Sequence, residues 1–120
     1  MKLIMVLVLV LLVMPTESFG MDSNNRYVIR GMGGHSCAEY NQYRANPSSR
    51  SFCWNWVGGY VTAYNRWRSN TYDIMSHIDI DSLRGWLDNY CKENSHKSSA
   101  DAVGALMSEL HPKRLKEEAQ

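Results

Sequence analysis

The stretch CWNWVGGYVTAYNRW, residues 53–67, decides the fold. Its apolar side chains recur at steps of three and four residues, which places them on one face of an α-helix. Two glycines interrupt this helix at its middle, and each costs about 1 kcal/mol relative to alanine. Such a pair predicts close packing against another helix. The residues of the apolar face are Cys53, Trp56, Val57, Tyr60, Val61, Tyr64 and Trp67.

A shorter helix is predicted before this stretch. Ser36 can accept a hydrogen bond from an early backbone N–H, so a helix is expected to begin at Cys37 and to continue through Tyr43. The segment at residues 45–49 ends it, because Pro47 disfavours helix at the residue before it.

Two further helices are predicted after residue 67. Residues 69–78 are expected to form a loop, and Asp79 then caps a third helix. Ser98 and Asp101 form a capping-box pattern that begins a fourth helix, which Pro112 stops. The sequence therefore predicts an all-α fold, a small bundle of about four short helices with antiparallel neighbours. The apolar face of the third helix contains Ile80, Leu83, Leu87, Tyr90 and Cys91, and that of the fourth contains Val103, Leu106, Met107 and Leu110.

The N-terminal region differs in composition from the rest of the chain. Twelve consecutive apolar residues, 3–14, follow Lys2. This run is shorter than the 18 or so residues of a membrane span but typical of a secretory signal peptide, predicted here as residues 1–20. We interpret residues 21–35 as a flexible arm, 36–112 as the helical domain and 113–120 as a charged tail. No stable membrane insertion is expected after cleavage.

Three cysteines remain after the signal peptide: Cys37, Cys53 and Cys91. Export implies an oxidising compartment, either the periplasm or the exterior. One disulfide with one cysteine left over is therefore expected, and the sequence by itself leaves three pairings open.

Several classes of function are disfavoured. A formal net charge of +1 argues against a nucleic-acid-binding protein. Neither a CxxC pair nor a protease-like Cys/His pattern is present, so no enzymatic activity is expected. His77, Asp79 and Asp81 could ligate a cation, but helix capping by Asp79 explains the pattern more simply. No metal or other cofactor is predicted.

Three segments together resemble a known family. They are SCAEY at residues 36–40, VGGYVTA at 57–63 and DNYCKEN at 88–94. Their order is similar to that of the HdeA/HdeB group of small exported helical proteins, over roughly residues 36–111. The resemblance implies that Cys37 and Cys91 form the disulfide. Cys53 then has no counterpart, and we expect it to be a buried free cysteine.

The resemblance also implies a non-enzymatic function, that of a periplasmic chaperone active in acid stress. Near neutral pH its apolar faces would be buried within the fold or in a homodimer. In acid the carboxylates protonate while 12 Lys and Arg and four His residues carry charge, so self-repulsion loosens the protein. Two apolar faces would then hold unfolded client proteins, one with Trp56, Tyr60 and Tyr64 and the other with Leu83, Leu87 and Tyr90. The alternative is that both faces serve only as the helical core.

A second resemblance gives an alternative. The segment WVGGY at residues 56–60 is similar to a signature of exported immunity proteins that neutralise type VI amidase effectors. Such a protein would bind the active site of one folded effector at neutral pH. An acid chaperone would instead bind many unfolded clients only after acidification.

Overall fold

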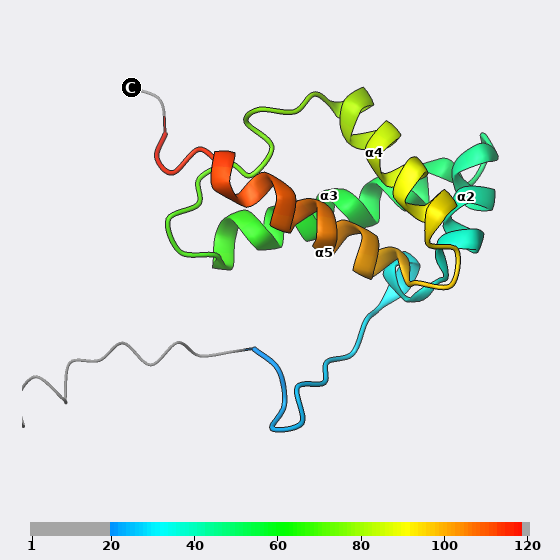
Figure 1. Cartoon of the computed structure of the whole chain (residues 1–120), viewed down its shortest axis with the longest axis horizontal. Helices are drawn as coiled ribbons and strands as arrows, with labels where there is room; N and C mark the ends of the chain where they lie inside the picture. Colours follow the sequence, from blue (N-terminus) through cyan, green and yellow to red (C-terminus); the bar gives the residue numbers. More distant parts are fainter. Residues whose placement is uncertain (1–19, 119–120) are drawn as a thin grey trace, which may run out of the picture.

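A computed structural model describes residues 20–118 (Figure 1). The predicted signal peptide lies outside this range except for Gly20. Within the described range the structure is helical and contains no strand, which confirms the predicted all-α class. Its elements are η1 (Gly31–Gly34), α2 (Cys37–Ala45), α3 (Arg50–Trp67), α4 (Ile80–Glu93), α5 (Ser99–Leu110) and η2 (His111–Lys113).

Side-chain caps fix where three of the helices begin. The Ser36 hydroxyl accepts a hydrogen bond from the Glu39 backbone N–H, and the Glu39 carboxylate accepts one from the Ser36 N–H. Ser98 and Asp101 form the same reciprocal pair at α5. Asp79 accepts from the backbone N–H groups of Asp81 and Ser82 at the start of α4. These starts confirm the sequence prediction.

The start of α3 differs from the prediction by three residues. The apolar pattern begins at Cys53, whereas the helix begins at Arg50. Its N-cap residue, Ser49, makes no side-chain capping bond and instead donates its hydroxyl to the Tyr43 carbonyl. No local sequence signal therefore marks this helix start.

A disulfide joins Cys37 of α2 to Cys91 of α4, with the Cα atoms 4.6 Å apart. This is the pairing implied by the family resemblance. Cys53 is free and buried, as predicted. Beside the disulfide, the Cys37 backbone N–H donates to the Lys97 carbonyl, so the start of α2 is also attached to the connection between α4 and α5.

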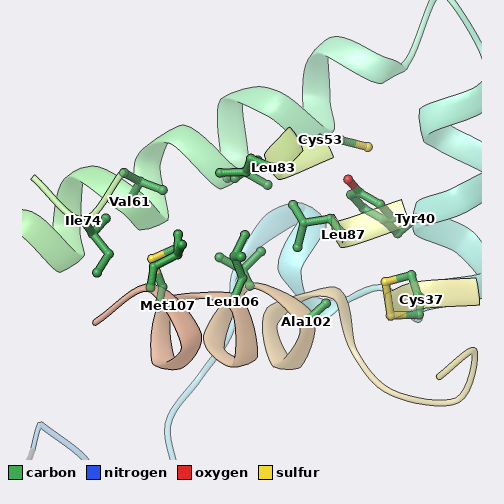
Figure 2. Close-up of a cluster of buried hydrophobic side chains, with 14 residues drawn as sticks. Cys37, Tyr40, Cys53, Val61, Ile74, Leu83, Leu87, Ala102, Leu106 and Met107 are labelled. Atoms are coloured by element: carbon green, nitrogen blue, oxygen red, sulfur yellow. A yellow bond between two sulfur atoms is a disulfide. The ribbon is translucent and has the colours of Figure 1, made fainter. Parts of the chain in front are cut away.

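The core lies where the helices meet. In Figure 1, α5 passes in front of α3, and α2 lies beside α4. Figure 2 shows side chains from α3, α4 and α5 converging on one apolar cluster. Ile74 joins it from the loop between α3 and α4, where the Asn65 side chain accepts a hydrogen bond from the Ile74 N–H. Leu83, Leu87, Leu106 and Met107 are almost completely buried.

The segment just before α2 is closely packed, although the sequence analysis placed it in a flexible arm. The indole N–H of Trp56 donates to the Arg30 carbonyl at 2.7 Å. The Ser99 hydroxyl donates to the Met32 carbonyl at 2.6 Å. Gly33 is buried against Trp56, and a Cβ at this position would overlap the indole ring. These contacts lie between residues distant in sequence, so local composition does not reveal them.

The prediction of close packing at Gly58 and Gly59 is wrong. Both residues are exposed, and a Cβ added to either would meet no atom within 4 Å. The close approach that requires a glycine occurs instead at Gly33. No helix within residues 20–118 is long and apolar enough to cross a membrane.

Replacing both bridged cysteines, C37S/C91S, is expected to lower the free energy of unfolding by about 4 kcal/mol. The disulfide spans 54 residues, and a loop of this length costs the unfolded chain that much conformational entropy. Chemical denaturation with and without a reducing agent measures the change. The reducing agent should destabilise the wild type and leave C37S/C91S unaffected. Equal stability of the wild type and C37S/C91S without the reducing agent would contradict the prediction.

Two glycine substitutions are expected to have opposite effects. Gly33→Ala should lower the free energy of unfolding by about 1–3 kcal/mol, because its methyl group overlaps the Trp56 ring. Gly58→Ala should raise it by about 1 kcal/mol, because the site is open and alanine favours helix. Thermal unfolding followed by circular dichroism compares both variants with the wild type. A stabilising Gly33→Ala would show that the segment before α2 does not pack as described.

Candidate functional site

Trp54 lies at the junction of α2, α3 and α4. The guanidinium of Arg44, from α2, lies 5.0 Å from the centre of its ring, and that of Arg84, from α4, lies 4.5 Å away. Both distances are within the range of a cation–π interaction. A single aromatic side chain of α3 thus contacts one arginine from each of the two neighbouring helices.

Each of these arginines also pairs with a carboxylate of α4. Arg44 donates from Nε and Nη2 to the two oxygens of Asp88, at 3.2 and 3.1 Å. Arg84 donates from Nη1 to Asp81 at 3.2 Å. The first pair is the more enclosed, since the Arg44 side chain is only 17% exposed. Two-point contact and low exposure hold the Arg44 guanidinium in one orientation.

These side chains line an open groove, which we call the Trp54 groove. Its volume is about 630 Å³. One wall is low at Gly85, where an added Cβ would meet no atom within 4 Å. The groove is lined by Arg44, Pro47, Arg50, Ser51, Trp54, Asp81, Arg84, Gly85 and Asp88.

Two smaller hollows adjoin the Trp54 groove along α4. A polar hollow of about 410 Å³ shares Arg44 and Asp88 with it and extends to Lys92. An apolar hollow of about 170 Å³ shares Trp54 and Arg84 and extends to Ile80. The surface beside α4 therefore changes from charged to apolar along its length.

A buried hydroxyl, that of Tyr40, and a buried thiol, that of Cys53, lie near the same junction. Figure 2 shows the Tyr40 hydroxyl directed toward the side of the core where Cys53 lies. This hydroxyl has no hydrogen-bond partner among the described residues. Burial raises the pKa of both Tyr40 and Cys53. The Cys53 thiol is therefore protonated at neutral pH and is a poor nucleophile.

The structure places all six residues of the two predicted faces within the apolar core or packed against it. Leu83 and Leu87 lie in the core. Trp56 and Tyr60 are half-buried neighbours, with ring centres 5.5 Å apart, beside the segment that precedes α2. Tyr64 packs at the end of α5, where its hydroxyl lies 2.7 Å from Nδ1 of His111.

The sixth predicted residue, Tyr90, lies on α4. It stacks on Trp86 with ring centres 5.3 Å apart. The indole N–H of Trp86 in turn donates to Glu109 of α5. Tyr90 thus packs against the apolar core beside the contact between α4 and α5.

The sequence analysis did not select Arg44, Arg84 or Asp88 as site residues. On α3, Trp54 lies at the edge of the apolar face. This position is the one feature of the sequence that could have singled out Trp54 as a site residue. Arg44 precedes Trp54 by about ten residues and Arg84 follows it by about thirty, on two other helices. No rule of sequence spacing therefore connects the three residues.

Capping carboxylates have lowered pKa values. The Ser36 backbone N–H, together with the Ser36 hydroxyl, lowers the pKa of Glu39. The Ser82 backbone N–H and hydroxyl lower the pKa of Asp79. Both carboxylates are therefore stabilised in their charged form by the folded helix starts. This use of Asp79 is the helix cap predicted from the sequence.

Within residues 20–118, no three His, Cys, Asp or Glu side chains are grouped closely enough to hold a metal ion. No model of a protein family, no characterised protein and no solved structure matches the chain. The functional inference therefore depends on the Trp54 groove itself.

Proposed function

We propose that this chain is an exported, non-enzymatic binding protein whose partner is another protein, held in the Trp54 groove. The observation that carries the proposal is the arrangement of Trp54 between Arg44 and Arg84 at an open groove. Tryptophan and arginine are the side chains most enriched among residues that dominate protein–protein binding energy. The disulfide supports export, because such bonds persist in oxidising compartments such as the periplasm.

A folded partner at neutral pH fits this groove best. The arginines are already oriented by Trp54, Asp88 and Asp81, so little side-chain entropy is lost on binding. This mode of action is that of an immunity protein or another inhibitor that binds one effector. It requires no unfolding of the binding protein.

The proposal is tested by filling the groove without altering its charge. Gly85→Gln places a side chain in the open wall and favours helix, so the variant should fold at least as well as the wild type. Gly59→Gln is the matched control, because this glycine is also exposed and mid-helical but lies outside the groove. With the oxidised protein as bait at pH 7, we expect one stoichiometric partner from the source organism's lysate.

Gly85→Gln should reduce recovery of that partner at least tenfold, whereas Gly59→Gln should leave it unchanged. Binding of the purified partner by calorimetry gives the same comparison in solution. Equal binding by the two variants would exclude the groove as the binding site. Absence of any stoichiometric partner would contradict the proposed function.

An acid-stress chaperone is the second candidate, favoured by the capping carboxylates. The pKa of Asp79 is lowered in the folded state, so its stabilising effect is complete above the unfolded-state pKa of about 3.9. That effect is lost as the pH falls through the lower, folded-state pKa. Loosening of α4 would then expose Leu83 and Leu87, two of the predicted client-binding residues that are buried in the fold.

Asp79→Asn separates the acid response from capping, because asparagine also caps helices but does not titrate. We expect the wild type to be more stable than Asp79→Asn at pH 5 and the difference to shrink as the pH falls through the lowered pKa of Asp79. Thermal midpoints measured across this range, with binding of an apolar dye, follow the change. A wild type that stays fully folded and binds no dye at pH 2 would exclude the chaperone mechanism.

A further inference from the structure

We propose that the Trp54 groove recognises an acidic segment of the partner protein, whose carboxylates bind the arginines that line the groove. This inference rests on the proposed protein-binding function and adds the chemistry of the partner. Charge, unused hydrogen-bond donors and the length of the groove each support it.

The side chains that line the Trp54 groove and its adjoining polar hollow carry a net positive charge. Four cationic side chains line the Trp54 groove and the adjoining polar hollow, against two carboxylates. Both carboxylates are already paired, Asp88 with Arg44 and Asp81 with Arg84. Arg50 and Lys92 have no ion-pair partner in the described part of the chain. A segment that supplies about two carboxylates would complete this arrangement.

The two arginines beside Trp54 keep donors available. A guanidinium has five N–H donors. Arg44 uses Nε and Nη2 for Asp88 and makes no other hydrogen bond within residues 20–118. Arg84 uses Nη1 for Asp81 and makes no other side-chain hydrogen bond within residues 20–118, so N–H groups of Nη1 and Nη2 remain unused. The planar fork of donors matches the geometry of a carboxylate.

The groove and its two adjoining hollows are together long enough to hold a short peptide. They follow α4 from Ile80 to Lys92, about 18 Å at the rise of an α-helix. An extended chain covers this distance in about five or six residues. The apolar hollow at Ile80 would accept an apolar side chain next to the acidic residues. The expected ligand is therefore an acidic segment with an apolar residue at one end.

Phosphate groups also bind arginine, but they fit this groove less well. Asp81 and Asp88 lie among the lining residues, where they repel the dense negative charge of a phosphate or a nucleic acid. Carboxylates spaced along a peptide can approach Arg50, which is exposed and forms no ion pair in the described part of the chain. Inorganic phosphate therefore serves as a competing ligand in the test.

The test uses blocked hexaglutamate as the probe and blocked hexaglutamine as its uncharged control. Binding to the oxidised protein at pH 7 is followed by the NMR signal of the Trp54 indole N–H. Arg50→Glu reverses the charge of an unpaired, exposed residue in the groove. Arg66→Glu makes the same change on α3 outside the groove and controls for overall charge. Neither residue forms an ion pair in the described structure. The guanidinium of Arg66 lies over the ring of Trp67.

We expect hexaglutamate to bind and hexaglutamine not to bind. Arg50→Glu should weaken hexaglutamate binding at least tenfold, and Arg66→Glu less than twofold. Equal binding of the two peptides, equal effects of the two substitutions, or full displacement by an equal concentration of inorganic phosphate would overturn the inference.

The same variants separate this inference from the proposed function. If a captured partner is blocked by Gly85→Gln but binds Arg50→Glu normally, the acidic-segment inference fails and the protein-binding function stands. If hexaglutamate binding depends on Arg50 but no protein partner is captured, the groove chemistry stands and the proposed function fails.

Discussion

The Cys37–Cys91 disulfide is the constraint on which the rest of the structure depends, because it sets the register of α2 against α4. Arg44 lies two helical turns after Cys37, and Asp88 lies about one turn before Cys91, so both fall on the same faces as the cysteines. The Arg44–Asp88 ion pair is thus a second link between the two helices. It holds the guanidinium of Arg44 beside Trp54 of α3 and so determines the shape of the groove. A covalent bond in the core in this way positions a polar surface one to two helical turns away.

Assembling the polar cluster around Trp54 costs more free energy than an apolar contact would. Bringing Arg44 to 17% exposure removes most of its hydration, and the ion pair with Asp88 offsets that cost only in part. Apolar residues of similar size could join α2, α3 and α4 at lower cost. The cluster also leaves the Nε of Arg84 without an acceptor. Such an arrangement is better explained by a need for oriented charge at the surface than by stability.

The sequence predicts those parts of the fold that depend on local contacts. Ser36, Asp79 and Ser98 act within three residues of themselves, so their capping patterns located α2, α4 and α5 correctly. The start of α3 was placed late because Ser49 uses its hydroxyl on α2 and no capping bond marks the helix. Gly58 and Gly59 were misinterpreted because a helical pattern does not distinguish a glycine facing a neighbour from one facing solvent. The groove is not predictable for a similar reason: Arg44, Trp54 and Arg84 lie on three different helices and meet only through tertiary packing.

The two candidate functions make opposite demands on pH, which has consequences for how the groove can be used. Recognition of an acidic segment requires ionised carboxylates on the partner, and these become neutral below about pH 4. Exposure of Leu83 and Leu87 to unfolded clients requires the same acid conditions, because both side chains are buried in the fold. One binding event cannot therefore use the Trp54 groove and the α4 core at the same pH. A protein that served both purposes would release its neutral-pH partner as it loosened, so acid would exchange one class of ligand for the other. The register imposed by Cys37 and Cys91 would survive this change, since a disulfide does not titrate, and would return Arg44 to Asp88 and Trp54 when the pH rose again.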